Sequence, residues 1–335
     1  MIKHIIILIL ILVVFCLSGF AAKVAVLPEL MKPGAMAVDD TRLYVTQEAS
    51  VFIYSLKDFQ LVKKFGRAGQ GPQEFHILPQ LPLNIDVRTD RLIVNSFGKI
   101  SYFTKQGEFI KEIKTKGIVA LLQPSGDNFL GMSVVVQDRV IYNTINLYDS
   151  ELNKLKEVYR AKNNFQPGRG FKVLVKTLAY QVYKDKILLP GKDDATIDVF
   201  DKEMKKLFSI HLDQEKIKVD QEFKDTVMNR IKTDPIARKN FEAAKPITFP
   251  DYFPAISYFF VNGDTIYVMT WKIENNVNEF FTYDMNGKFK KHLMIPIQYE
   301  TQLQPYPITI NKGKLYQIVE NEDEEVWEFH MSKIE

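Results

Sequence analysis

The sequence predicts an all-β fold, a six-bladed β-propeller of four-stranded blades with a helical insertion between blades 4 and 5. The first observation is a two-strand motif that recurs at a near-constant spacing, each time after another pair of short apolar strands. The second is that the last unit lacks an outer strand while a spare strand precedes the first unit. The two ends of the chain are therefore expected to complete one blade.

Each copy of the motif is a strand ending in an aromatic residue, a polar turn, and a second strand rich in lysine. The aligned aromatic residues are Tyr54, Phe103, Tyr148, Phe200, Tyr283 and Phe329. Four of the five steps between them are about 48 residues, and the remaining step, from Phe200 to Tyr283, is about 35 residues longer. Upstream of each copy, apolar and polar residues alternate as in half-buried strands, for example in Leu83–Val87 and Arg91–Val94. Regular units without linkers disfavour tandem β-sandwiches.

The predicted ring closure pairs the N-terminal strand, Lys23–Leu27, with the last blade. Only four residues follow Met331, so the sixth unit has three strands of its own. Adding the N-terminal strand as the fourth removes an exposed sheet edge.

The first 21 residues predict a secretory signal peptide, because a basic start precedes the apolar run Ile5–Leu17 and small residues that end at Ala21. The alternative is an uncleaved membrane anchor formed by residues 5–22, which is near the shortest length that spans a membrane. In both cases residues 22–335 are expected to form one exported propeller, in the periplasm or outside the cell.

The composition narrows the class of partner. The chain is 46% apolar and 25% charged, as is usual for a globular protein. Its 44 basic and 41 acidic residues leave a formal charge of +3, which disfavours nucleic acid because phosphate neutralisation needs clustered lysine and arginine. Cys16 is the single cysteine and lies in the predicted signal peptide, so the mature chain has no thiolate nucleophile or disulfide. We expect a monomer that meets the membrane only through an uncleaved N-terminal segment.

Phe65–Phe75 is the glycine-rich run of the chain, and it lies between two predicted strands. A phosphate-binding loop needs its glycines to open a helix, whereas here another strand follows and no Lys-Ser/Thr pair ends the run. We interpret the run as the tight crossover from blade 1 to blade 2, in which glycines permit left-handed backbone.

This crossover resembles that of a known family. The resemblance is carried by Phe65, Gly66, Gly69, Gly71, Phe75 and Pro79, followed by Asn84–Val87. These residues resemble the NHL-type six-bladed propellers and, more closely, the related secreted bacterial propellers with a GxGPGEF-like loop after the first blade. Gln73 stands where that loop usually has glycine, and Pro254–Val268 is similar to the proline-led inner-strand unit of these proteins. The resemblance implies a propeller fold and an exported location, but no particular activity.

Residues 213–254 form the predicted insertion between blades 4 and 5. Asp220 is expected to cap a helix that ends near Lys232 and carries an apolar side that includes Phe223. A second helix is expected to start at Asp234. The insertion either covers loop backbone or forms a lid over the mouth of the central channel.

The long connections between blades are expected on one face, and binding residues concentrate on loops held by a rigid scaffold. The candidate binding residues are Arg67, Gln73, Glu74 and His76 in the glycine-rich crossover, Arg169 in the connection from blade 3 to blade 4, and Tyr252 after the helical insertion.

We predict a non-enzymatic protein that binds a small molecule, a glycan or an envelope protein, with no catalytic residues and no metal or other cofactor. The chain has no GxSxG elbow and no HExxH spacing. The alternative is a metal-dependent hydrolase or lyase of the propeller-lactonase type, with a divalent ion held in the channel by Glu, Asn and Asp from several blades. A third possibility is a structural module of an envelope complex.

Overall fold

The structure is a computed structural model. It describes residues 22–77, 83–115, 117, 119–174, 179–234, 238, 245–274, 277–301 and 304–334. The predicted signal peptide or anchor lies outside the described residues, as does most of the predicted second helix after Asp234. A search of the described part finds no helix with the length and apolar character to cross a membrane.

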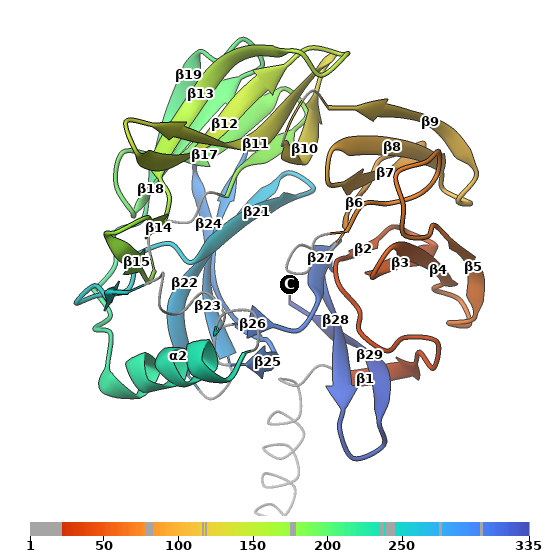
Figure 1. The fold of residues 1–335 in the computed structure, drawn as a ribbon. Helices are drawn as coiled ribbons and strands as arrows, with labels where there is room; N and C mark the ends of the chain where they lie inside the picture. The colour runs from red at the N-terminus through yellow and green to blue at the C-terminus, as the bar shows by residue number, and fades with distance from the viewer. Residues whose placement is uncertain are drawn as a thin grey trace, which may run out of the picture.

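The described residues form eight β-sheets, of which six have four antiparallel strands each (Figure 1). We number these six sheets in chain order. Sheet 1 contains β2 (Met36–Val38), β3 (Arg42–Gln47), β4 (Ser50–Ser55) and β5 (Leu61–Phe65). Sheet 2 contains β6 (Asn84–Val87), β7 (Arg91–Ser96), β8 (Lys99–Thr104) and β9 (Phe109–Lys114). Sheet 3 contains β10 (Ala120–Ser125), β11 (Asn128–Gln137), β12 (Val140–Tyr148) and β13 (Lys154–Lys162). Sheet 4 contains β16 (Gln181–Tyr183), β17 (Lys186–Pro190), β18 (Thr196–Asp201) and β19 (Lys206–His211). Sheet 5 contains β21 (Tyr258–Asn262), β22 (Thr265–Glu274), β23 (Val277–Asp284) and β24 (Phe289–Pro296). Sheet 6 contains β27 (Ile308–Asn311), β28 (Lys314–Asn321), β29 (Val326–Lys333) and β1 (Ala22–Val26).

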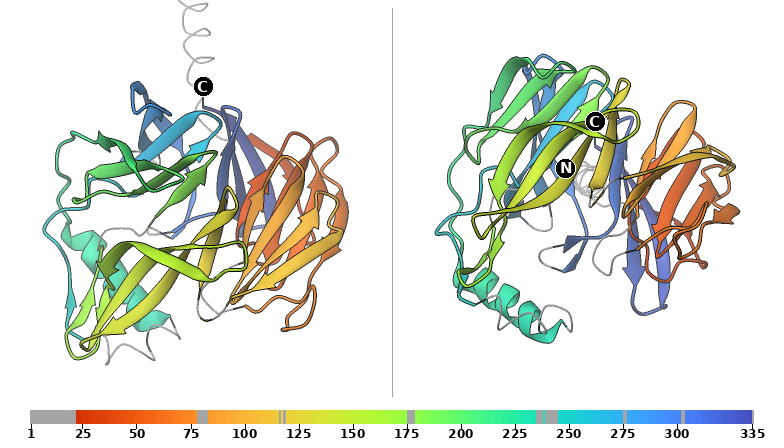
Figure 2. Two further views of the ribbon diagram at one scale, coloured as in Figure 1. Left: turned by 90° about the horizontal axis from the view of Figure 1, so that it is seen from above. Right: turned by 45° about the horizontal axis from the view of Figure 1, so that its top comes forward.

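The sheets follow one another in space as they do in sequence (Figures 1 and 2). The first strands of neighbouring sheets lie together: β2 contacts β6 and β27, and β16 contacts β10 and β21. The architecture is all-β with one helix, α2, in the described part, and it is consistent with a propeller.

The apolar core is divided into clusters that lie between neighbouring sheets. One cluster joins sheets 6 and 1 and includes Leu27 and Phe329, and another joins sheets 1 and 2 around Phe75. The aligned aromatic residues occupy these positions: Tyr54, Phe103, Tyr148, Tyr283 and Phe329 are buried and Phe200 is half-buried. The spacing of about 48 residues therefore marks equivalent places in successive sheets.

The predicted pairing of the two chain ends is confirmed. β1 pairs antiparallel with β29, from Ala22 opposite Met331 to Val26 opposite Glu328. Beyond the strand, Leu27 donates its N–H to the Trp327 carbonyl at 2.8 Å. The first described strand thus forms the outer edge of the last sheet.

The buried carboxylate of Glu328 stabilises the pairing of β1 with β29. Glu328 on β29 forms an ion pair with Lys23 of β1 at 2.6 Å, accepts a hydrogen bond from Asn321 and hydrogen-bonds to His330. Burial disfavours the charge of Glu328, but the hydrogen bonds from Asn321, Lys23 and His330 outweigh it and lower its pKa to about 2. The charged form of Glu328 therefore stabilises the closure.

Acid should weaken this closure. Because the folded-state pKa lies below the unfolded value of about 4.3, Glu328 contributes stability above about pH 4 that is lost as the pH falls towards 2. We expect Glu328→Gln to cost about 2 kcal/mol at neutral pH, since hydrogen bonds to a charged group are lost. Urea denaturation from pH 7 to pH 2 should show the difference between wild type and variant shrinking below about pH 4. A difference that does not change with pH would contradict this account.

The two faces of the sheet array carry different segments. The crossovers between sheets lie beside the turns between second and third strands, as the hydrogen bonds from Thr115 N–H to the Gly98 carbonyl and from Leu212 N–H to the Ala195 carbonyl show. The end of β29 lies on the other face, because Ile334 donates its N–H to Gly313 in the turn between β27 and β28. β1 begins on this second face, beside the C-terminus (Figure 2).

Candidate functional site

The glycine-rich crossover is held by its own charged residues. Arg67 Nε donates to Glu74 Oε1 at 2.9 Å, and Glu74 Oε2 accepts the Gly71 N–H at 2.8 Å. These two contacts, first the backbone N–H and then the guanidinium, lower the pKa of Glu74. The buried Lys99 ties the loop to sheet 2, since its ammonium donates to the Gly71 carbonyl at 2.8 Å and to Glu112 at 2.9 Å. Two of the predicted binding residues, Arg67 and Glu74, are thus already occupied by contacts within the loop.

The backbone at Gln73 shows why the GxGPGEF-like loop usually has glycine at this place. Its φ of 59° lies in the left-handed region, where glycine is usual and a side chain adds strain. Gly66 and Gly69 also have positive φ, as predicted for this crossover. Phe75 is fully buried below them. Its neighbour His76 lies edge-on to the Phe97 ring.

The remaining predicted binding residues lie in other crossovers. Arg169 is exposed in the turn between β14 (Phe165–Gln166) and β15 (Gly170–Lys172). β15 pairs in parallel with β20 (Ile247–Thr248), so the connections on either side of sheet 4 join in one small sheet. Tyr252 follows β20 and is 48% exposed, with the Lys216 ammonium 5.7 Å from its ring centre.

The helical insertion contains α2 (Gln221–Thr233), as predicted. Asp220 caps it by accepting the Phe223 N–H at 2.8 Å. Near its other end, Arg230 donates to Thr301 and Gln304, each at 3.0 Å. These two residues belong to the small hairpin of β25 (Tyr299–Thr301) and β26 (Gln304–Pro305), which precedes sheet 6. α2 is therefore capped at its first turn and attached to the hairpin near its last turn.

A groove of about 990 Å³ lies between α2, the segment that leads into it, the end of β22 and the hairpin. We call it the α2 groove. It is lined by Gln214, Glu215, Lys216, Ile217, Lys218, Asp220, Glu222, Phe223, Phe253, Trp271, Lys272, Ile273, Glu274, Glu279, Tyr299, Glu300 and Thr301. None of the six predicted binding residues is among them, although Tyr252 directly precedes Phe253.

Three aromatic rings form the apolar part of the α2 groove. Phe253 stacks on Trp271 with ring centres 4.9 Å apart, and Phe223 meets Phe253 edge-on at 4.8 Å. The Trp271 indole N–H is buried and has no hydrogen-bond partner among the described residues. An aromatic surface of this kind is common in binding sites because it offers a large contact area at little entropic cost.

The polar part of the α2 groove centres on Glu279, which is nearly buried. Its carboxylate accepts a hydrogen bond from Thr270 at 2.9 Å and pairs with His292 at 3.0 Å. The Lys272 ammonium lies 3.3 Å from Glu274 and 3.9 Å from Glu279. Glu274 foremost, and Glu279 after it, raise the pKa of Lys272. A cation thus already occupies this pair of carboxylates.

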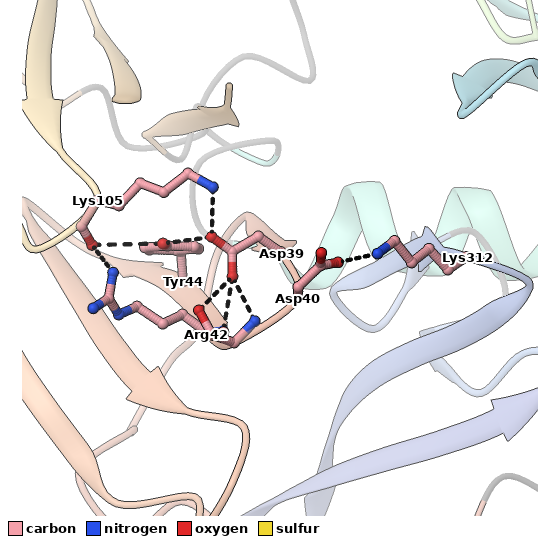
Figure 3. Close-up of polar contacts among 7 residues, drawn as sticks. Asp39, Asp40, Arg42, Tyr44, Lys105 and Lys312 are labelled. Carbon is pink, nitrogen blue, oxygen red and sulfur yellow. Dashed lines mark hydrogen bonds and ion pairs between the residues drawn. The ribbon is translucent and has the colours of Figure 1, made fainter. Parts of the chain in front are cut away.

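A second polar cluster lies on the opposite face and joins sheets (Figure 3). Asp39 accepts hydrogen bonds from Tyr44, the Arg42 N–H and Lys105, and Asp40 pairs with Lys312 of sheet 6 at 2.5 Å. Burial opposes ionisation of Asp39, but the hydrogen bond from the Thr41 N–H, followed by those from Lys105, Tyr44 and the Arg42 N–H, prevails and lowers its pKa. Because its groups satisfy one another, we assign this cluster a structural role.

Within the part of the chain that the structure describes, no group of three or more His, Cys, Asp or Glu side chains is arranged to hold a metal ion.

No protein-family model and no curated protein matches the chain. Solved structures are similar at a distance. They include the luciferin-regenerating enzyme, at 9% identity and a TM-score of 0.45, with 94% of this chain and 95% of that one covered. BamB from Moraxella catarrhalis has 12% identity and a TM-score of 0.32 over 89% of this chain and 71% of that one. Hsv2 from Kluyveromyces lactis has 12% identity and a TM-score of 0.37 over 90% of this chain and 98% of that one. These neighbours are propeller-like, but so distant that the architecture and the site rest on the contacts of this chain.

Proposed function

We propose that the protein is an exported, non-enzymatic six-bladed propeller that binds a small molecule, a glycan or a protein on the face that carries the long crossovers. The six four-stranded sheets and the pairing of β1 with β29 support a closed ring. The basic and apolar start of the sequence supports export. The resemblance to secreted NHL-like propellers belongs to the same proposal.

The observation that carries the proposal is the α2 groove. It combines volume for a ligand, a surface of aromatic rings and several charged groups, as binding sites usually do. α2 forms one wall and is fixed by its contacts to Phe253 and Thr301, which supports the interpretation of the insertion as a cover over a site.

The two tryptophans of the chain allow a direct test. Trp271 lies in the α2 groove, whereas Trp327 is 8% exposed and packs between sheets 6 and 1. In a Trp327→Phe variant, Trp271 is the sole indole reporter. We expect a ligand found by screening sugars, peptides and metabolites to change its emission, and to leave that of Trp327 unchanged in a Trp271→Phe variant. Ligands that bind equally well to wild type and Trp271→Ala would place the site elsewhere.

A further inference from the structure

The charge of the α2 groove differs from that of the chain. Six carboxylates and three lysines line it, which gives a net charge of −3 in a chain of formal charge +3. The exposed Glu215, Glu222 and Glu300 form no hydrogen bond or ion pair with described residues, although the charge of Glu215 adds to that of Glu274 and Glu279 in raising the pKa of Lys272. Unpaired carboxylates next to aromatic rings attract lysine and arginine side chains, through charge and through cation–π contact.

The backbone of β22 adds a second, independent feature. Its pairing with β21 extends from Thr265 to Met269 only. Its pairing with β23 on the other side shifts register after Met269 and resumes at Ile273 and Glu274. Among the described residues, nothing pairs with the inner edge of β22 beyond Met269. Within the irregular stretch, the Lys272 N–H donates to the Thr270 hydroxyl at 3.0 Å. An open strand edge that borders a groove can accept an extended peptide as a further strand.

We infer that the α2 groove binds an extended polypeptide segment rich in lysine or arginine, which adds along the open edge of β22. The segment places basic side chains near Glu215, Glu222 and Glu300, and alternate apolar side chains on Trp271 and its neighbouring rings. Lys272 occupies part of the acidic surface and competes with the incoming cation. The inference rests on the proposed function and narrows its ligand to one class.

The test compares three probes on the Trp327→Phe protein: a blocked peptide of alternating lysine and valine, its glutamate counterpart and an uncharged oligosaccharide. We expect the lysine peptide to bind at least about tenfold more tightly than the glutamate peptide, and to weaken as salt rises. Anisotropy of labelled peptides on wild-type protein gives the same comparison without a mutation.

Matched variants locate the contact. Replacing Glu215, Glu222 and Glu300 together by glutamine should weaken the lysine peptide about tenfold, whereas Lys272→Met should tighten it. The control is the triple change Asp127→Asn, Glu151→Gln and Asp185→Asn, three exposed carboxylates in turns of the opposite face, which should have no effect. Methylating alternate backbone nitrogens of the peptide should abolish binding in one register and spare it in the other, since strand addition uses every second N–H.

The two proposals fail separately. If the oligosaccharide or another probe changes Trp271 emission and the lysine peptide shows no preference over the glutamate peptide, the peptide inference is wrong and the binding function stands. If the lysine peptide binds equally to the groove variant and the control variant, it binds outside the α2 groove and the inference is also wrong. If both backbone-methylated registers bind as well as the parent peptide, strand addition is wrong.

Discussion

Deleting residues 22–30 is expected to lower the free energy of unfolding by roughly 3–6 kcal/mol, because it exposes the space filled by the buried Leu27 and Leu30. The deletion also removes the ion pair of Lys23 with Glu328 and the strand that pairs with β29. Urea denaturation of the purified protein measures the effect. The bared edge of β29 should in addition make the truncated protein associate with itself, which sedimentation detects.

The control for this deletion is Met31→Ala, since Met31 is 82% exposed and adjoins the deleted segment. It should leave the denaturation midpoint within experimental error. Equal stability of the truncated and full chains would show that the pairing of β1 with β29 contributes nothing to the stability of the fold.

Phe75→Ala is expected to cost about 3–5 kcal/mol, as is usual for a large buried aromatic residue. Phe75 is fully buried, packs against Phe103 with ring centres 6.1 Å apart, and lies so close to Gly66 that a Cβ there would be 2.4 Å from its ring. The residue thus holds the glycine-rich crossover in the core between sheets 1 and 2. Thermal and urea denaturation measure the loss.

Two matched changes separate this role from a general effect of truncation. Phe289→Ala removes the same side chain at a position that is 52% exposed, and should change stability by less than about 1 kcal/mol. Arg67→Ala alters the same crossover at a side chain that is 81% exposed, and should have a similarly small effect. A Phe75 variant as stable as these two would contradict the structural role.

The strands were predictable because their signal is local and repeated. Alternating residues define each strand, and aromatic residues such as Tyr54 and Phe103 recur at one inter-sheet position. The closure followed from counting strands at the two ends. α2 was predictable from Asp220 and the apolar spacing behind it.

The α2 groove was not predictable in this way, because its residues come from four separate stretches of the chain. In the sequence, Trp271 is one more alternating residue of a predicted strand. No nearby residue pattern indicates that β22 extends past the end of its pairing with β21. Most of the predicted binding residues lie in the glycine-rich crossover instead, because its Arg, Gln, Glu and His side chains are close together in the sequence. Its contacts show why such a run is ambiguous: Arg67 and Glu74 satisfy each other.

The position of the chain ends has a consequence for how the molecule is presented. β1 begins, and β29 ends, on the face opposite to α2 (Figure 2). An attachment made through residues before Ala22 or after Ile334 therefore leaves the α2 groove directed away from the point of attachment. A molecule tethered to a surface at either end would present its α2 groove to the surrounding solution.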